Sequence, residues 1–167
     1  MKILLVLVFG VSVVVSLGLT PPKPNFGGTW TMDHGRSFGL PPDVQQTMII
    51  TQADNKIDLE TRITNAQGES SIRDSYIVDG EEREFTPQSP TGPVAGSKGK
   101  RKATWLPNGR GIAVEEETTS QTPKGAATGH LTRKWTISND GELIIDLYID
   151  DQRGSFETKR TFIKKQG

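Results

Sequence analysis

Residues 130–150 constrain the fold of this chain more than any other segment, because their turn and their alternation both predict a β-hairpin. The loop at residues 139–141 ends in a glycine, which suits the position that needs positive φ in a short hairpin loop. With this loop as the turn, Trp135 lies opposite Ile145, and one face of the hairpin is apolar except for Arg133. The other facing pairs in this register are Ile137 with Leu143, Arg133 with Leu147, Leu131 with Ile149, Lys134 with Asp146 and His130 with Asp150.

The composition suits one small globular domain that is rich in turns. The chain has 167 residues, with 18 Gly, 10 Pro and no Cys, and its 20 basic and 20 acidic side chains balance. A balanced charge gives no indication of nucleic acid as a partner. Because no disulfide can form, the fold has to be stabilised by its core.

Residues 1–18 have the pattern of a secretory signal peptide, and we expect cleavage after Gly18. Lys2 precedes an apolar run at residues 3–17, and Ser16 and Gly18 form a small-x-small cleavage site. The alternative is an uncleaved membrane anchor, although the run is shorter than the roughly 20 residues that a spanning helix needs. The sequence therefore predicts an exported protein, periplasmic or secreted.

Alternation of apolar and polar residues predicts ten antiparallel strands within a single domain at residues 27–167, after a proline-rich leader at residues 19–26. Six strands have explicit boundaries at residues 28–33, 44–53, 56–64, 69–79, 81–86 and 155–165, and the other four come from the hairpin at residues 130–150 and a hairpin around residues 108–109.

Turn chemistry sets the registers of these strands. The Asn-Gly dipeptide at residues 108–109 favours a type I′ turn that places Arg101 opposite Glu116. A loop at residues 122–127 then brings Glu116 beside Arg133. The same reasoning pairs Ile50 with Leu59, Leu59 with Asp74, Glu60 with Arg73, Ala103 with Val114, Ile145 with Arg160, Leu143 with Phe162, Ile149 with Phe156 and Asp146 with Lys159.

The connections complete the fold prediction. Residues 34–43 and 87–99 are rich in Pro and Gly and are expected to be loops, and the Asp-Gly dipeptide at residues 79–80 predicts a hairpin between the fourth and fifth strands. No helix is predicted that could cover a sheet face, so the strands bury their apolar side best by closing on themselves. The predicted fold is all-β, a ten-stranded antiparallel up-and-down barrel.

Residues 25–30, Asn-Phe-Gly-Gly-Thr-Trp, resemble the Gly-x-Trp motif with which lipocalins begin. In lipocalins this Trp lies on the first strand and closes one end of the barrel, so the resemblance implies that role for Gly28 and Trp30. A basic residue of the last strand packs over the Trp in that family, which offers Arg160 or Lys159 here. The resemblance implies a lipocalin-like, calycin-type exported bacterial protein. The chain departs from lipocalins in its ten predicted strands and in lacking a disulfide and a clear C-terminal helix.

Charged residues with the phase of the inner face are the sharpest candidates for function. The inner face is predicted to carry three arginines, Arg101, Arg133 and Arg160, and two carboxylates, Glu116 and Asp74. Their sum is one unit of positive charge. Buried ions have to be paired, hydrated or neutralised by a ligand. Either these residues close an ion network that only fixes the register, or they bind the carboxylate of an amphipathic anion. The predicted ligand-binding residues of the barrel interior are Arg101, Glu116, Arg133, Arg160, Trp105, Trp135, Tyr76 and Asp74.

The sequence favours binding over catalysis. His34 and His130, the two histidines, lack metal-ligand spacing to other donors, so no metal site is predicted. No nucleophile-base pair, phosphate loop or dinucleotide fingerprint occurs, and no catalytic residue or cofactor is predicted. We expect an exported, non-enzymatic, monomeric protein that holds a small amphipathic or apolar molecule in the barrel interior, with no nucleic-acid partner and no membrane insertion after cleavage. The alternative is a structural or protein-interaction module of the cell envelope, whose barrel is filled by side chains.

Overall fold

The structure, a computed structural model, describes residues 22–122 and 125–165, and their regular secondary structure is all β. The predicted signal peptide at residues 1–18 lies outside the described residues, as does the first part of the leader at residues 19–26. Among the described residues, no helix is long and apolar enough to cross a membrane.

Ten of the twelve strands form one antiparallel sheet, in the order β4-β3-β2-β1-β12-β11-β10-β9-β8-β5, and β6 and β7 form a small separate hairpin. The strands are β1 (Gly28–Phe38), β2 (Gln45–Ala53), β3 (Lys56–Asn65), β4 (Gly68–Ile77), β5 (Glu82–Phe85), β6 (Gln88–Ser89), β7 (Gly92–Pro93), β8 (Ser97–Trp105), β9 (Gly111–Thr122), β10 (Gly125–Ile137), β11 (Leu143–Asp151) and β12 (Gly154–Lys164).

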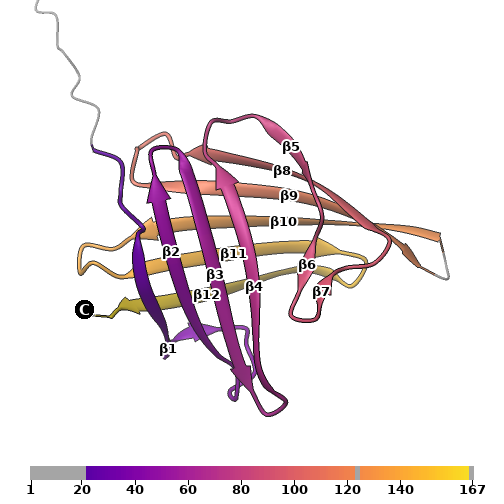
Figure 1. Ribbon diagram of the computed structural model, residues 1–167, viewed down its shortest axis with the longest axis horizontal. Coiled ribbons are helices and arrows are strands. Elements are labelled where there is room, and N and C mark those ends of the chain that lie inside the picture. Colours follow the sequence, from indigo (N-terminus) through magenta and orange to yellow (C-terminus); the bar gives the residue numbers. More distant parts are fainter. Residues whose placement is uncertain (1–21, 123–124, 166–167) are drawn as a thin grey trace, which may run out of the picture.

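The large sheet curls into a half-barrel. Strands β1 to β4 cross in front of strands β8 to β12, and the inner faces of the two layers meet (Figure 1). The core lies between these layers, and its largest fully buried side chains are Trp30, Trp135, Tyr76, Phe26 and Phe162. Phe26, which the sequence placed in the leader, is therefore part of the core. The all-β class and the antiparallel sheet of ten strands are confirmed.

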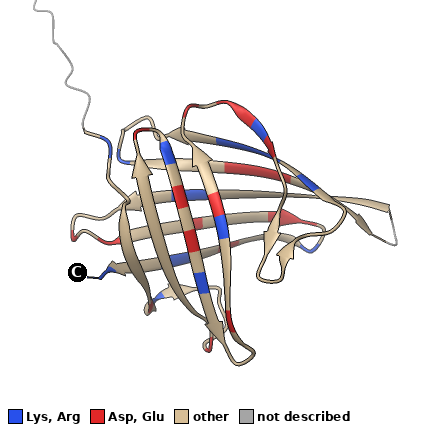
Figure 2. Ribbon diagram, viewed as in Figure 1, with Lys and Arg blue, Asp and Glu red and all other residues tan. Residues whose placement is uncertain are grey.

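Most of the predicted registers are confirmed, because hairpin turns determine register locally. All the pairs expected for residues 130–150 occur between β10 and β11, and Ile145 faces Arg160 across β11 and β12. The pairs expected across β2, β3 and β4 and across β8 and β9 are also present. Acidic and basic residues both occur along β3 and β4, so that neither strand carries one sign of charge alone (Figure 2).

The predicted register between β9 and β10 is wrong by two residues. Glu116 faces Leu131 rather than Arg133, because β9 continues to Thr122 and β10 already begins at Gly125. The predicted loop at residues 122–127 was therefore too long, although part of it lies outside the described residues. A shift of two residues keeps every side chain on its own face, so the inner wall has the expected members.

The predicted hairpin at residues 79–80 is also wrong, because β5 pairs with β8 and not with β4. The amide of Gly80 donates a hydrogen bond to the carbonyl of Ala103 at 2.9 Å, and Val78 makes a parallel bridge to Ala103. Pairing with β8 sets Glu82 opposite Lys102 and Glu84 opposite Lys100, which are favourable cross-strand pairs of opposite charge. Within the described residues, β4 and β5 are consequently the two edges of the sheet, and we call the line where β4 faces β5 and β8 the seam.

Two predicted loops are partly strands. Strand β1 runs on to Phe38, so His34 lies in a strand, and an irregularity of its pairing with β12 falls between Asp33 and Phe38. The prolines that suggested a loop come only after Gly39, which has a positive φ of 78° and starts the real turn. Residues 87–99 contain β6, β7 and the start of β8, and β6 contacts β4 at the seam.

Candidate functional site

A cavity of about 350 Å³ lies between the two layers of the half-barrel. Its volume falls within the range of small-molecule sites, and its wall is mainly apolar and aromatic with a few polar groups, as such sites require. The apolar wall includes Met48, Leu59, Ile72, Tyr76, Trp135, Ile145, Leu147 and Phe162. The polar and charged residues of the wall are Gln46, Thr61, Asp74, Gln88, Arg133 and Arg160.

One end of the interior is sealed by aromatic side chains. The indole Nε1 of Trp30 donates a hydrogen bond to the carbonyl of Phe26 at 2.8 Å, and both side chains are buried. The ring of Phe26 meets Trp135 edge to face, with 5.8 Å between ring centroids. We call this the sealed end. Trp30 is thus buried in the core at this end, while the barrel-closing role that the Gly-x-Trp motif implies for it stays a prediction.

The basic side chain over Trp30 is Lys164 rather than the expected Arg160 or Lys159. Lys164 is the direct partner of Trp30 across β1 and β12, and its Nζ lies 5.2 Å from the ring centroid. A Cβ on Gly28 would come within 2.6 Å of the Lys164 side chain, so the glycine of the motif leaves room for this lysine. Gly28 also has a φ of 135°, a backbone conformation that other residues rarely adopt.

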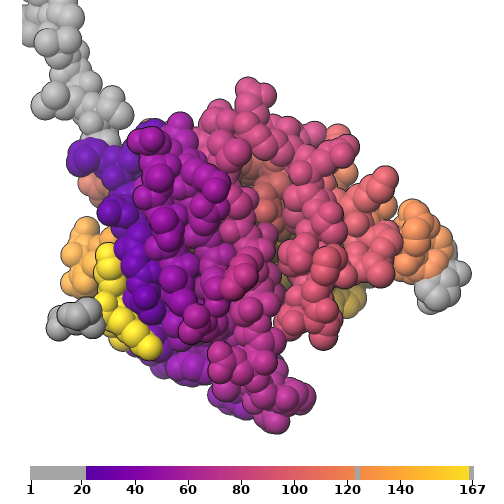
Figure 3. Space-filling view, viewed as in Figure 1, coloured from indigo at the N-terminus to yellow at the C-terminus, as the bar shows by residue number. Residues whose placement is uncertain are grey.

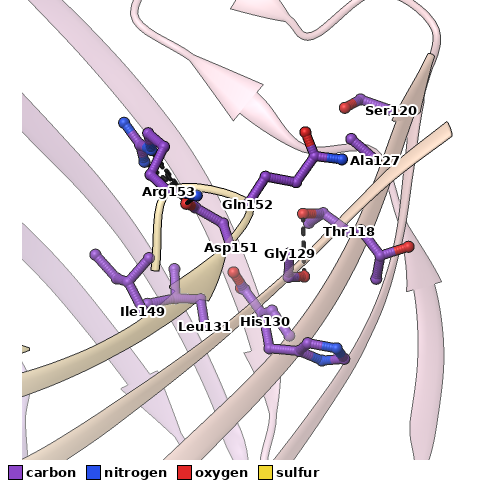
Figure 4. Close-up of a pocket in the computed structure, with 12 residues that line it drawn as sticks. Thr118, Ser120, Ala127, Gly129, His130, Leu131, Ile149, Asp151, Gln152 and Arg153 are labelled. Carbon is purple, nitrogen blue, oxygen red and sulfur yellow. Dashed lines mark hydrogen bonds and ion pairs between the residues drawn. The ribbon is translucent and has the colours of Figure 1, made fainter. Parts of the chain in front are cut away.

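The other end of the cavity is open and leads into a second hollow of about 440 Å³, which we call the vestibule (Figure 4). Leu131 and Ile149 line both spaces, so the two adjoin. The vestibule forms where β9, β10 and β11 extend past β1 to β4, and small or polar residues such as Thr118, Ser120 and Gly129 line it.

Four charged side chains form a connected ion network beside the cavity. Arg101 Nε lies 2.6 Å from Glu116 Oε1, and Arg101 Nη2 lies 2.8 Å from Asp74 Oδ1. Arg133 Nη1 lies 2.6 Å from Glu116 Oε2, as an ion pair that lacks the alignment of a hydrogen bond. The predicted pairing of Glu116 with both arginines is thus present, although Arg133 reaches it diagonally. We call these four residues the ion network.

Arg101 also connects the two sides of the seam. Its guanidinium lies between two rings, 4.7 Å from the centroid of Tyr76 and 4.0 Å from that of Phe85. Tyr76 and Asp74 are on β4 and Phe85 is on β5. Arg101 therefore contacts both edge strands, which are not joined by backbone hydrogen bonds. A hollow of about 620 Å³ flanks this contact, and Figure 3 shows the surface hollowed between β4 and β5.

Burial and neighbouring charges alter two groups near the network. Burial raises the pKa of the Tyr76 hydroxyl to about 12, so the phenol stays protonated at neutral pH. Burial acts to lower the pKa of Arg133, but attraction to the carboxylates of Glu116 and Asp74 outweighs it and raises this pKa above its ordinary value. The Arg133 guanidinium therefore stays charged and keeps its ion pair with Glu116.

Arg160 also lines the cavity but stands apart from the ion network. Within residues 22–122 and 125–165, no carboxylate lies within ion-pair distance of it, and its Nε is buried without a hydrogen-bond partner. Burial, followed by the like charge of Arg133, lowers the pKa of Arg160 to about 10. Arg160 is still positive at neutral pH, so the cavity carries one uncompensated positive charge.

The predicted interior residues occupy different places. Asp74, Tyr76, Arg133, Trp135 and Arg160 line the cavity, while Arg101 and Glu116 lie beside it in the ion network. Trp105 does not line the cavity: its indole lies under Lys23 Nζ, 4.6 Å from the ring centroid. The residues that sequence reasoning missed are Phe26, Gln46, Gln88 and Lys164. Of these, Phe26 had a detectable signal, an isolated aromatic residue two positions before Gly28 of the Gly-x-Trp motif.

The histidines lie away from the cavity. His130 is on the outer face, and its Nδ1 is 3.9 Å from Glu117 Oε2 with both side chains exposed. In the part of the chain that the structure describes, no group of His, Asp and Glu side chains is arranged to hold a metal ion. The chain was also compared with protein-family models, curated proteins and solved structures, and nothing matched it.

Proposed function

We propose that this protein is a binding protein that holds a small amphipathic or apolar molecule in its interior. The observation that carries the proposal is the cavity of about 350 Å³, which has an apolar and aromatic wall and adjoins the vestibule. Burial of a ligand's apolar surface there is worth roughly 25 cal/mol per Å² before the costs of association. The alternative, an envelope module with a filled barrel, requires side chains to occupy this space.

The fold proposed for this function is a lipocalin-like barrel whose wall closes at the seam through side chains. Support comes from the strand order, in which neighbours along the chain are neighbours in the large sheet everywhere except at the seam. The bridge between Val78 and Ala103 and the contact of Arg101 with Asp74 span that seam. The sealing of one end by Trp30 and Lys164 is a further similarity to the Gly-x-Trp arrangement of lipocalins.

The protein acts after export, in the periplasm or outside the cell, once residues 1–18 have been removed. This part of the proposal rests on the sequence pattern of those residues. The binding protein is monomeric, catalyses no reaction and binds no nucleic acid, which agrees with the mixed signs of charge on the outer faces of β3 and β4 (Figure 2). After cleavage it does not insert into the membrane.

Titration of the mature protein with N-phenylnaphthylamine, a neutral apolar dye, tests the proposal. We expect saturable binding with one site per chain and quenching of tryptophan fluorescence, because Trp135 lines the cavity. The variant Leu147→Trp fills the cavity and abolishes this binding. The matched control Ile163→Trp adds the same bulk on the outer face, where Ile163 is 48% exposed, and binds the dye normally. Absence of saturable binding in the unchanged protein would refute the proposed function.

A further inference from the structure

We propose that the cavity selects an anion, and that Arg160 binds the single negative charge of the ligand. This inference rests on the proposed function and deepens it by naming the chemical class of the ligand. The expected class is an amphipathic monoanion, such as a carboxylate or sulfonate attached to an apolar body. It differs from the sequence-based hypothesis, in which several inward arginines shared that role.

The ion network removes Arg101 and Arg133 from the candidates. Arg101 is engaged by Asp74 and Glu116, and Arg133 is engaged by the second oxygen of Glu116. Two guanidinium groups and two carboxylates leave no net charge, so the network offers an incoming anion little attraction. Opening it would leave buried charges unpaired, which is costly.

Arg160 is the cation of the cavity that lacks a counter-ion. It lines the cavity, and no carboxylate among the described residues pairs with it. The like charge of Arg133 acts on it unfavourably. An unpaired charge in such a place is unfavourable unless water or a ligand compensates it. An anion in the cavity would supply that compensation and could accept paired hydrogen bonds from the guanidinium.

Other unsatisfied donors lie close to Arg160 in the same wall. Strands β10, β11 and β12 build this wall in cross-strand rows. From the sealed end toward the vestibule, the rows are Trp135 with Ile145 and Arg160, Arg133 with Leu147 and Thr158, and Leu131 with Ile149 and Phe156.

Four of the described side-chain atoms that are buried without a hydrogen-bond partner belong to the first two rows. One of them, Arg133 Nη1, lies 2.6 Å from Glu116 Oε2 and is already engaged by that carboxylate. The other three are Trp135 Nε1, Arg160 Nε and Thr158 Oγ1, which can all donate, and buried donors without acceptors are rare in folded proteins. Their concentration in one wall indicates a missing acceptor, which is what an anionic group provides.

The rows also orient the ligand. Arg160 is in the deepest of the three rows, whereas the row nearest the vestibule is made of the apolar residues Leu131, Ile149 and Phe156. The charged end of the ligand therefore points inward and the apolar end points toward the vestibule. One uncompensated cation also favours a single negative charge over a doubly charged group such as a phosphate monoester.

A pair of dyes of similar shape tests this inference in the mature protein. Anilinonaphthalene sulfonate is an anion, and N-phenylnaphthylamine is its neutral counterpart. We expect Arg160→Met to weaken binding of the sulfonate at least about tenfold, the usual scale for a charged hydrogen bond, and to leave the neutral dye within about twofold. The variant Arg160→Lys keeps the positive charge, so we expect it to retain part of the preference for the sulfonate over the neutral dye. The control Lys159→Met removes a positive charge from the next residue, which faces Asp146 on the outer side, and changes neither affinity.

The outcomes separate this inference from the proposed function. If the neutral dye binds and Arg160→Met leaves the sulfonate affinity unchanged, the anion inference is wrong and the cavity is a general apolar site. If Lys159→Met weakens binding of the sulfonate as much as Arg160→Met does, the preference for the anion comes from electrostatic attraction to the protein surface. The inference is then also wrong. If neither dye binds the unchanged protein, the proposed function itself fails. A melting temperature of Arg160→Met equal to or above that of the unchanged protein supports a binding role, because a structural role would lower it.

Discussion

The sealed end and the cavity end of the same interior are built differently. At the sealed end, Trp30 and Phe26 are fully buried, and the indole nitrogen of Trp30 donates to the carbonyl of Phe26. At the cavity end, about 350 Å³ is left open, and donors of Arg160 and Trp135 lack acceptors. Empty volume and unpaired donors both reduce stability. The comparison predicts that the sealed end contributes more to the stability of the fold than the cavity end does, which is consistent with the proposed binding role of the cavity.

The largest expected effect comes from emptying the sealed end. Trp30→Ala should lower the free energy of unfolding by about 4 kcal/mol, because it removes a buried aromatic side chain and leaves a cavity. Urea unfolding followed by circular dichroism measures this change. The control Phe38→Ala truncates an aromatic residue that is 50% exposed and should change stability by no more than about 0.5 kcal/mol. Equal effects of the two variants would mean that the sealed end is not the stabilising region.

Removing the central carboxylate of the ion network should have the next largest effect. Glu116→Gln leaves Arg101 and Arg133 without their shared partner in a largely buried place, and we expect a loss of about 3 kcal/mol in the free energy of unfolding. Glu115→Gln is the matched control, because Glu115 is exposed and faces Lys102 on the outer side; its effect should stay within about 0.5 kcal/mol. A loss below 1 kcal/mol for Glu116→Gln, on the order of a surface pair, would show that the network does not hold the seam.

The smallest expected effect concerns the connection that crosses from β4 to β5. Hydrogen bonding from Arg83 lowers the pKa of Asp79 to about 2, from its ordinary value of 3.8. A depressed carboxyl pKa contributes stability above the unfolded value, and this contribution is lost as pH falls from about 4 toward 2. The melting temperatures of the unchanged protein and of Asp79→Asn should therefore differ slightly at pH 6 and converge near pH 2. If the two melting temperatures still differ near pH 2, the ionised carboxylate of Asp79 is not the source of the difference in stability.

Local turn chemistry explains how much of the fold the sequence predicted. The Asn-Gly turn at residues 108–109 and the Gly141 loop led directly to the correct pairing of Arg101 with Glu116 and of Trp135 with Ile145. The register between β9 and β10 was missed because residues 118–130 contain neither an Asn-Gly nor an Asp-Gly dipeptide. Where the turn signal is weak, alternation alone determines the face but not the register.

Long-range contacts account for what was missed at the site. Strand β5 follows an Asp-Gly dipeptide that normally forms a hairpin, yet bonds from Gly80 to Ala103 direct it to β8. The sequence showed one surplus positive charge among the inward residues, but only the side-chain geometry shows that Asp74 and Glu116 engage the other arginines and leave Arg160 unpaired. Similarly, nothing in a strand pattern indicates that Lys164 rather than Arg160 covers Trp30.

The measurement that tests the binding role most directly is native mass spectrometry of the mature protein purified from the cells that produce it. We expect a non-covalent adduct of one small molecule per chain, which is lost when the protein is denatured and is detected in negative-ion mode after extraction. When the Leu147→Trp variant is incubated with the same small molecules, we expect no adduct, because the tryptophan side chain occupies the cavity. The bare mass of the chain alone, both as purified and after incubation with anilinonaphthalene sulfonate and N-phenylnaphthylamine, would contradict the binding role.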